Sequence, residues 1–428
     1  MVAQDAQILE TDVVVVGAGC AGCIAAVAAA RGGARVLLIE RNGFLGGTST
    51  AVLDTFYAFY TPGQRPVKVV GGLPDLVVER LCAQDALIER PNTFGAGLGL
   101  TYSPEALKRV WDALIAEAGV CVLLHAVVDE VTMEGARPAE VVVATKAGRW
   151  RVRPRIVVDT SGDADIVALA GLPYTLAARE GPVQSLTTTF TLANVDVERA
   201  LAIKRADFVA LMRAANESGD FHLPNEAGSV HRTPSEGLVF SLLVQLFDVD
   251  ATDPWALSAA EAEGRRQVAA YVRFLQARVP GYERAVLVST APHIGVRETR
   301  RIQGDYVLTE DDVLAGRRFP DAIARCGAPI EDRGAGRDTR WVYLPEGESY
   351  DVPYRCLLPV GGDDVLVAGR CLSATHDAHA SVRSMGTCMA MGQVAGTAAA
   401  MSVAAGVSPR ALDTVSLRAC LRETGAIC

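Results

Sequence analysis

The chain has 428 residues, half of them hydrophobic and 21% charged, and its formal net charge at pH 7 is -9. This length predicts two domains, and this composition is typical of an ordered globular protein. The acidic balance argues against a nucleic-acid partner, because non-specific binding to nucleic acid requires a cationic field. The ten cysteines are scattered and only Cys20 and Cys23 have metal-ligand spacing, so we expect a reducing, cytoplasmic setting and no metal site.

The first elements in chain order form a βαβ unit. Residues 13–16 belong to a continuous apolar run, which is typical of a parallel strand covered on both faces. A helix is predicted over residues 21–31, directly after this strand, and a second apolar strand over residues 34–40. A unit of about thirty residues has the length that a right-handed crossover requires.

The turn between the first strand and the helix carries the pattern G-x-G-x-x-G, at Gly17, Gly19 and Gly22. In a dinucleotide-binding turn the first glycine makes the tight turn, the second lets the backbone approach the pyrophosphate, and the third allows close helix–strand packing. Glu40, at the end of the second strand, is placed to accept hydrogen bonds from ribose hydroxyls. The turn therefore predicts a bound dinucleotide.

The chain then alternates between loops, helices and strands. Residues 41–100 are rich in glycine and turns, and Ser103 has the position of an N-cap before a helix that runs to residue 118. The other predicted elements are a helix at 73–81, a third buried strand at 120–126, an antiparallel excursion over 127–152 and an apolar strand that starts at 155 and leads into a Gly-Asp turn.

Residues 174–352 have a different character, with mixed strands, polar helices and many arginines, and we interpret them as an inserted second domain. We predict an α/β fold in which residues 1–173 and 353–428 build a Rossmann-type dinucleotide-binding domain, with a parallel sheet, helices and an antiparallel excursion. The inserted domain is of mixed α+β type. The apolar stretch 385–407 contains several glycines and Gln393, so we interpret it as a buried helix and not as a membrane span.

Three long motifs resemble a known family. They read "ERNGFLGGTST" (residues 40–50), "GVRETRRIQGDYVLT" (295–309) and "SATHDAHASVRSMGTCMAMGQVAG" (373–396). In these motifs, which are spread over nearly the whole chain, the sequence resembles the FAD-dependent oxidoreductase family. The resemblance implies a glutathione-reductase-like fold and FAD as the cofactor, and "DTSGDAD" (159–165) looks like the family's return strand to the FAD-binding domain.

The glycine turn and the resemblance together predict the residues that bind FAD. Small residues of the C-terminal helix, Gly392 and Gly396 among them, would let it lie close to other backbone, and its first turn (384–387) would face the flavin pyrimidine edge. The predicted FAD-binding residues are Gly17, Gly19, Cys20, Ala21, Gly22, Glu40, Arg41, Gly46, Gly47, Thr48, Ser49, Val128, Ser161, Gly162, Asp163, Gly369, Arg370, Met385, Gly386 and Thr387.

Two histidines are candidate catalytic residues. His376 and His379 lie in a predicted loop just before the C-terminal helix. Each could be a general base, could hydrogen-bond the flavin, or could have a structural role. We prefer His376, because it lies inside the best-matched motif.

Two arginines are candidates as well. Arg297 and Arg301 would point the same way if their segment were a strand, toward a carboxylate or the flavin. The alternative is an ion-paired strut between the domains, with Glu298 or Asp305 as the acidic partner. His293 precedes them in the same segment.

The cysteines of the glycine turn spell C-x-x-C, which elsewhere indicates a redox dithiol or half of a zinc site. Here the thiols of Cys20 and Cys23 would lie beside the pyrophosphate and away from the flavin ring. We therefore interpret both as small apolar fillers, with the backbone N–H of Cys20 touching the pyrophosphate.

These features predict an FAD-dependent dehydrogenase or oxidase, which takes a hydride from a small organic substrate while a base such as His376 takes the proton. Oxygen or another acceptor would reoxidise the flavin. One alternative is a flavin monooxygenase or an NAD(P)H-linked reductase, although no second G-x-G-x-x-G is present. Alternatives from other classes are a flavin-bearing RNA-modification or RNA-binding protein, and a lyase or isomerase that FAD assists without redox chemistry. No membrane partner is expected, and a homo-oligomer is left open.

Overall fold

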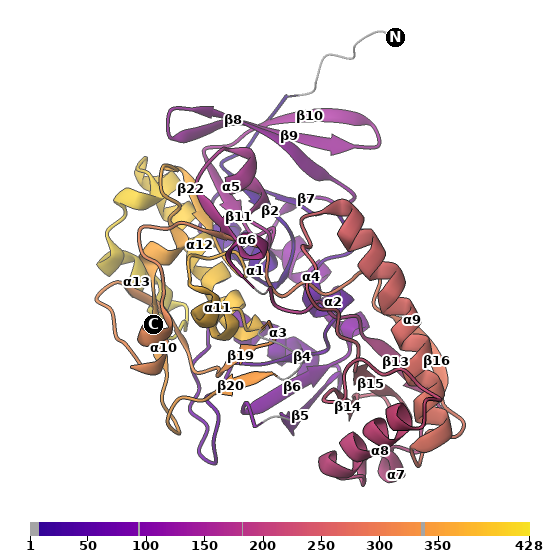
Figure 1. The fold of residues 1–428 in the computed structure, drawn as a ribbon. Helices are drawn as coiled ribbons and strands as arrows, with labels where there is room; N and C mark the ends of the chain where they lie inside the picture. The colour runs from indigo at the N-terminus through magenta and orange to yellow at the C-terminus, as the bar shows by residue number, and fades with distance from the viewer. Residues whose placement is uncertain (1–7, 93–94, 182, 335–338) are drawn as a thin grey trace.

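The computed structural model describes residues 8–92, 95–181, 183–334 and 339–428, and its centre is a five-stranded parallel sheet (Figure 1). The strands follow in the order β22 (Val365–Val367), β11 (Ile156–Asp159), β2 (Val13–Val16), β3 (Val36–Ile39) and β7 (Cys121–Leu123). β22 comes from the C-terminal part of the chain and pairs with β11, so both ends of the chain build one sheet. The α/β class is confirmed.

The third strand expected at residues 120–126 is present as β7, but the expectation that it is buried was wrong. β7 is the last strand in the sheet order, beside β3. Cys121 is exposed, and Val122 and Leu123 are half-buried. The opposite edge strand, β22, is buried because a further cluster of apolar side chains covers it, whereas Val122 and Leu123 only border the two main cores.

The central sheet lies between a layer of helices and an antiparallel sheet. In β2, Val13 and Val15 face the core that includes the helices, whereas Val14 and Val16 face the core shared with the antiparallel sheet. Because both faces are covered, the strand appears in the sequence as one uninterrupted apolar run. The helices are α1 (Cys20–Arg31), α4 (Pro104–Glu117) and α12 (Met385–Ala405). The predicted antiparallel excursion consists of β8 (Val127–Glu134), β9 (Arg137–Thr145) and β10 (Gly148–Arg153), and β1 (Ile8–Glu10) joins this sheet beside β10 in parallel.

The helices α1 and α12 touch backbone to backbone. A Cβ added at Gly392 would lie 2.2 Å from the carbonyl oxygen of Ala21, and one added at Gly396 would lie 2.1 Å from that of Ala25. Only glycine fits at both places, which confirms the predicted small-residue face of α12. By length and composition α12 is apolar enough to cross a membrane, but 72% of its apolar window is buried inside the protein, as in a core helix.

A second hydrophobic core lies inside the inserted domain. Its buried side chains come from residues 186–294, whereas those of residues 308–358 pack into the first core. The domain boundaries after residues 173 and 352 remain a proposal. Residues 186–294 contain a four-stranded sheet and three helices: β14 (Ser229–Arg232), β15 (Val239–Leu242), β13 (Phe190–Ala193), β16 (Val286–Thr290), α7 (Val197–Leu201), α8 (Arg205–Glu217) and α9 (Pro254–Arg278).

Shorter elements connect these layers. Ser103 caps α4 as predicted, since its side chain accepts the backbone N–H of Ala106. The shorter elements are α2 (Thr48–Ala51), β4 (Thr55–Phe56), α3 (Leu73–Cys82), β5 (Leu87–Pro91), β6 (Leu98–Tyr102), α5 (Asp165–Leu169), β12 (Tyr174–Leu176), α6 (Ala177–Glu180), β17 (Arg300–Ile302), α10 (Glu310–Leu314), β18 (Ala322–Cys326), β19 (Ile330–Asp332), β20 (Arg340–Val342), β21 (Tyr350–Pro353), α11 (His376–Val382) and α13 (Thr414–Glu423).

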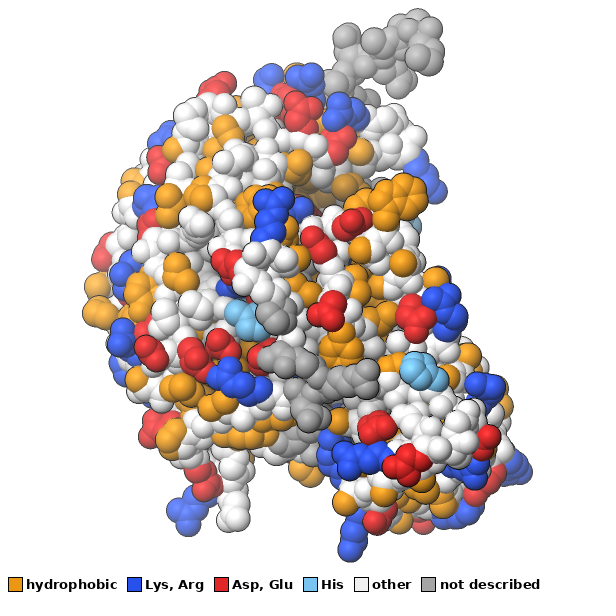
Figure 2. Space-filling model, in the orientation of Figure 1, with side chains coloured by type: hydrophobic (Ala, Val, Ile, Leu, Met, Phe, Trp, Pro, Cys, Tyr) orange, Lys and Arg blue, Asp and Glu red, His pale blue; other side chains and the backbone are white. Residues whose placement is uncertain are grey.

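The charged side chains of the visible face are mixed in sign. Figure 2 shows Lys and Arg interspersed with Asp and Glu over this face, without a broad basic patch. This distribution agrees with the net charge of -9 and provides no extended cationic surface on the side shown.

We predict that Gly396→Ala lowers the free energy of unfolding by about 1–3 kcal/mol, because the new methyl group forces α12 away from α1. Helix propensity alone would predict that the substitution raises the free energy of unfolding, since alanine is more favourable than glycine in a helix interior by about 1 kcal/mol. Thr397→Ala is the control, because Thr397 is the next residue and only half-buried. Urea unfolding of both variants measures the difference, and a Gly396→Ala protein as stable as the wild type would contradict the packing argument.

Candidate active site

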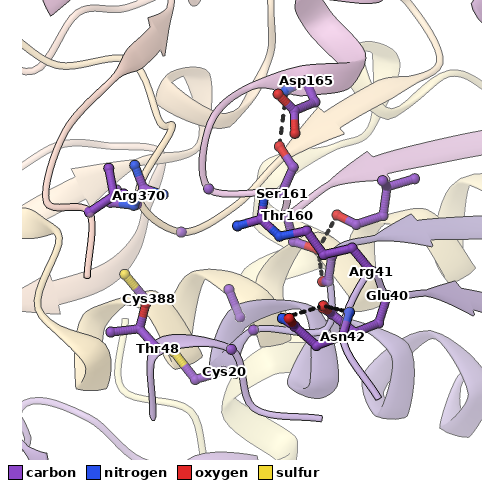
Figure 3. Close-up of a pocket in the computed structure, with 18 of the residues that line it drawn as sticks. Cys20, Glu40, Arg41, Asn42, Thr48, Thr160, Ser161, Asp165, Arg370 and Cys388 are labelled. Atoms are coloured by element: carbon purple, nitrogen blue, oxygen red, sulfur yellow. Dashed lines mark hydrogen bonds between the residues drawn. The ribbon is translucent and has the colours of Figure 1, made fainter. Parts of the chain in front are cut away.

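The main cavity opens at the carboxyl ends of the parallel strands. Its wall includes Val16 at the end of β2, Ile39 at the end of β3, Thr160 just after β11 and Ala368 just after β22. Ligands of open α/β sheets bind at this edge. Figure 3 shows Glu40, Arg41 and Asn42 at one end of the cavity, and Cys20, Thr48 and Cys388 at the other.

The glycine turn forms the middle of the cavity wall. Gly17 has a φ of 93°, and a Cβ at Gly22 would lie 1.9 Å from the carbonyl oxygen of Gly17, so both serve the turn itself. Gly19 lines the cavity, and a Cβ built on it would meet no protein atom within 4 Å. No side chain caps the N-terminus of α1 here, and its first turn has no acidic residue. The open face of Gly19 and the N–H groups of α1 fit a pyrophosphate.

Glu40 stands on the wall at one end of the cavity, with its carboxylate largely buried. One oxygen accepts the backbone N–H of Ala18 at 2.7 Å, and the other accepts the backbone N–H and the side-chain amide of Asn42 at 2.7 and 2.8 Å. These bonds hold the carboxylate beside the cavity. Its contact with ribose hydroxyls stays a prediction.

The segment after β3 closes the cavity from the side of the turn. The backbone N–H of Gly46 donates to the carbonyl of Ala18 at 2.7 Å, and Gly46 forms a parallel bridge with Gly19. Gly47 has a φ of 52°, and a Cβ on it would lie 2.9 Å from the Cα of Gly19. The two glycines therefore let this loop lie directly against the dinucleotide turn, so that Thr48 reaches the cavity.

Asp163 joins three segments behind the cavity. Its carboxylate forms an ion pair with Arg370 at 2.8 Å and accepts the hydroxyl of Thr299 at 2.6 Å, while its carbonyl accepts Arg300 at 3.0 Å. Burial opposes ionisation, but the charge of Arg370 and the bond from Thr299 hold the pKa of Asp163 below its usual value. Arg370 is thereby fixed as a wall residue.

Most of the predicted FAD-binding residues line this one cavity. Those that do not line it lie behind the wall and shape it. The lining residues are Gly17, Gly19, Cys20, Ala21, Glu40, Arg41, Gly47, Thr48, Val128, Ser161, Gly162, Gly369, Arg370 and Met385. The others are Gly22, Gly46, Ser49, Asp163, Gly386 and Thr387.

The cysteines of the turn behave as fillers. Cys23 is buried and its thiol donates to the carbonyl of Ala18 at 3.3 Å, and both cysteines are free thiols. Burial raises the pKa of Cys20 to about 12 and that of Cys23 well above its usual value. A thiol that stays protonated is a poor nucleophile, so the geometry supports no dithiol chemistry here. Within the described ranges, no group of three or more His, Cys, Asp or Glu side chains could hold a metal ion.

The cavity thus has the parts that a long dinucleotide needs: a polar end, an open glycine turn at a helix N-terminus, and a second end beside α12. Residues 12–421 match the sequence profile of the FAD dependent oxidoreductase family. The chain belongs to this family. FAD is accordingly its cofactor, and the protein is an FAD-dependent oxidoreductase.

Two further similarities concern a relative and solved structures. Thiamine thiazole synthase of Aeropyrum pernix is 32% identical over 191 residues, which are 41% of this chain and 64% of that protein. The structure of p-nitrophenol 4-monooxygenase from Pseudomonas putida DLL-E4 is similar with a TM-score of 0.53 at 14% identity, over 97% of this chain and 86% of that one. A geranylgeranyl bacteriochlorophyll reductase-like protein from Thermoplasma acidophilum gives a TM-score of 0.47 at 14% identity, over 98% and 85%. At this identity the likeness shows the Rossmann-type FAD fold alone.

The two candidate histidines lie outside the cavity wall, in the short helix α11 and not in the predicted loop. His376 contacts Glu298 at 2.9 Å and Asp332 at 3.2 Å. Burial alone would lower its pKa, but these two carboxylates raise it to about 10, so His376 is a cation at neutral pH. His379 is fully buried, donates to the carbonyl of Arg370 at 2.7 Å, and has its pKa lowered to about 3 by burial. Their catalytic role stays a prediction, and these contacts give it no support.

The two candidate arginines do not share a face, because the expected strand is absent before residue 300. Gly295 pairs with Thr187 instead, which diverts the chain, and β17 begins only at Arg300. Arg301 is buried and forms ion pairs with Glu298 at 3.1 Å and Glu180 at 2.7 Å. Glu298 is one of the two acidic partners that the strut alternative named, but these pairs lie within residues 174–352 and do not join the two proposed domains. Arg297 lines the cavity.

The cavity wall contains a histidine, His293, for which no role was predicted from the sequence. His293 Nδ1 lies 3.0 Å from the carbonyl oxygen of Ile294, and this oxygen can only accept, so the proton of the neutral ring sits on Nδ1. The other nitrogen, Nε2, is buried and has no hydrogen-bond partner among the described residues. Its neighbours Gly295 and Arg297 line the same wall. The only sequence signal for His293 was its place two residues before the matched motif at 295–309.

We predict that Gly19→Asp yields a stable protein that has lost FAD. Aspartate is a favourable N-cap, so the free energy of unfolding of the apoprotein should stay equal or rise by a few tenths of a kcal/mol. The carboxylate fills the place beside the turn and repels the pyrophosphate, so we expect FAD affinity to fall at least about tenfold. Flavin content after gel filtration measures this loss.

Gly19→Asn is the matched control, because it adds the same volume without the charge. We expect it to lose less affinity than Gly19→Asp. A Gly19→Asp protein that retains a full complement of FAD would contradict the placement of the pyrophosphate.

Proposed function

We propose that this protein is an FAD-dependent dehydrogenase or oxidase that takes a hydride from a small organic substrate. The observation that carries the proposal is the free, buried Nε2 of His293 on the wall of the FAD cavity. When a C–H bond is oxidised to a double bond, the neighbouring O–H or N–H must lose its proton to a base. Two carboxylates of this wall are already engaged, Glu40 by backbone N–H groups and Asp165 by Arg300, whereas His293 Nε2 has no partner among the described residues.

The chain's own residues divide the work of holding FAD. Glu40 and Arg41 form the adenosine end, and Gly19 with the N-terminus of α1 forms the pyrophosphate site. The second end of the cavity lies at the start of α12, where Met385 lines the wall. Bound FAD supplies the two-electron acceptor that none of these side chains can provide.

The N-terminus of α12 makes this second end electropositive. α12 has 21 residues, and no side chain caps its first turn. The backbone N–H of Gly386 donates to the carbonyl of Tyr57 at 3.0 Å, which fixes the start of the helix against the loop after β4. The positive end of the helix dipole favours negative charge that develops nearby during oxidation of the substrate.

His293 is oriented for proton transfer by its surroundings. Its Nδ1–H is used by the carbonyl of Ile294, and the backbone N–H of Ile294 donates to Glu261 at 2.6 Å. The loop that carries the ring is therefore tied to α9. A ring whose Nδ1–H is held in this way keeps the other nitrogen, Nε2, unprotonated in a single tautomer.

The second candidate function is a flavin monooxygenase or an NAD(P)H-linked reductase. Its support is the fold shared with p-nitrophenol 4-monooxygenase. Such an enzyme must accept a hydride from a nicotinamide, whereas a dehydrogenase or oxidase is reduced by its own substrate.

Anaerobic mixing with NADPH and NADH separates the two candidates. We expect the flavin absorbance near its visible maximum to stay unchanged over the time of a turnover. Photoreduction of the same sample is the control, since it demonstrates that the flavin can be bleached. Rapid bleaching by either nucleotide would reject the dehydrogenase or oxidase assignment.

We predict that His293→Gln slows reduction of the flavin by an oxidisable substrate by about 10²–10⁴-fold, because glutamine cannot take the proton. FAD content should stay unchanged. His376→Gln is the comparison, since His376 lies in the other histidine-containing segment and faces Glu298 and Asp332. Anaerobic stopped-flow absorbance measures both rates, and a larger loss for His376→Gln than for His293→Gln would reverse the assignment of the base.

A further inference from the structure

Two arginines on the cavity wall have few hydrogen-bond partners. Arg297 donates from Nη1 to the backbone carbonyl of Ser185 at 2.6 Å. Arg383 donates from Nη2 to the backbone carbonyl of Glu331 at 3.3 Å, and its Nε is buried without a partner among the described residues. A guanidinium has five N–H donors, so both groups retain unused donors at the cavity.

The same two arginines have no carboxylate of their own. Across residues 8–92, 95–181, 183–334 and 339–428, neither Arg297 nor Arg383 forms an ion pair. The charge of Glu331 acts on both, but its carboxylate forms its ion pair with Arg333, at 2.6 Å. Glu298, whose charge also acts on Arg383, is already paired with Arg301.

The charges around Glu331 are therefore unbalanced. Burial lowers the pKa of both Arg297 and Arg383, and the charge of Arg333 lowers it further. Burial should raise the pKa of Glu331, yet it is held below its usual value by Arg333, Arg383 and Arg297. Three arginines thus surround one glutamate. Partly buried positive charge without a counter-ion is costly, and an anion from outside would relieve that cost.

We propose that the substrate is an organic acid whose carboxylate binds between Arg297 and Arg383. Planar guanidinium groups bind carboxylates through paired, charge-assisted hydrogen bonds. Arg297 follows His293 by four residues in the same wall segment, so an anchored carboxylate holds the carbon to be oxidised near His293 Nε2. This inference rests on the proposed function, since it names the substrate class of that site.

The FAD-loaded protein tests the inference with simple acids. Acetate and benzoate are titrated at constant ionic strength, with chloride as the balancing anion, and binding is read from the visible flavin spectrum. We expect saturable spectral changes with both acids. The neutral analogues acetamide and benzamide should bind at least about tenfold more weakly, because they lack the charge that the arginines require.

Variants of the two arginines test whether their side chains bind the acid. We expect Arg297→Met and Arg383→Met each to weaken benzoate binding by about 10- to 100-fold, and the lysine variants to weaken it less. Arg355→Met is the matched control, because Arg355 pairs with Asp321 away from the cavity and its loss removes the same charge from the surface. Thermal unfolding and flavin content of every variant are measured beside the titration.

Three results would overturn the inference. The first is the absence of saturable binding by either acid, or equal binding of acids and amides. The second is unchanged benzoate binding in both methionine variants. The third is loss of FAD from these variants while the remaining loaded fraction binds benzoate normally, since the arginines would then serve the cofactor. Bleaching by NADPH would reject the proposed function but would leave these binding results unaltered, so the two failures are distinguishable.

Discussion

The backbone contact between α1 and α12 is the constraint on which the site depends. Gly392 and Gly396 bring α12 against the carbonyls of Ala21 and Ala25, at distances that no side chain tolerates. Both helices begin at the same cavity, where the thiol of Cys20 lies 3.9 Å from the carbonyl of Met385. Two helix N-termini from opposite ends of the chain are thereby aimed at one ligand. The arrangement brings both helix N-termini to the same cavity through a single backbone contact.

Asp163 extends this constraint to the inserted domain. It fixes Arg370 in the wall, while Thr299 and Arg300 tie their segment of the inserted domain to the loop after β11. His293 and Arg297 belong to the wall segment that precedes these two residues. The position of the proposed base is thus set by bonds that the FAD-binding domain itself makes. Binding of the cofactor and placement of the base are parts of one network.

The sequence predicted features that lie within one short segment, and it missed features that depend on contacts between segments far apart in the chain. The glycine turn could be predicted because its chemistry lies within one strand–turn–helix unit, and Gly19 and Glu40 both stand at the cavity. The sequence favoured His376 over His379, but the contacts of His376 could not be predicted from it, because Glu298 and Asp332 come from other segments. The strand expected around Arg297 fails for the same reason: the bridge between Gly295 and Thr187 redirects the backbone. A motif identifies residues that matter, but only tertiary contacts decide which of them face the ligand.

The arginines of the cavity depart from the rule that the neighbouring buried arginines follow. Arg370 has Asp163, and Arg301 has Glu298 and Glu180, as expected where buried charge must be neutralised. Arg297 and Arg383 lack such a partner in the described part of the chain, and the carboxylate nearest to both, Glu331, is shared with Arg333. A protein that neutralises its other buried cations gains no stability from leaving these two exposed to each other's charge. Departures from the rule that buried charges are neutralised are expected at functional sites. The two unneutralised arginines therefore support a site at which the ligand supplies the negative charge.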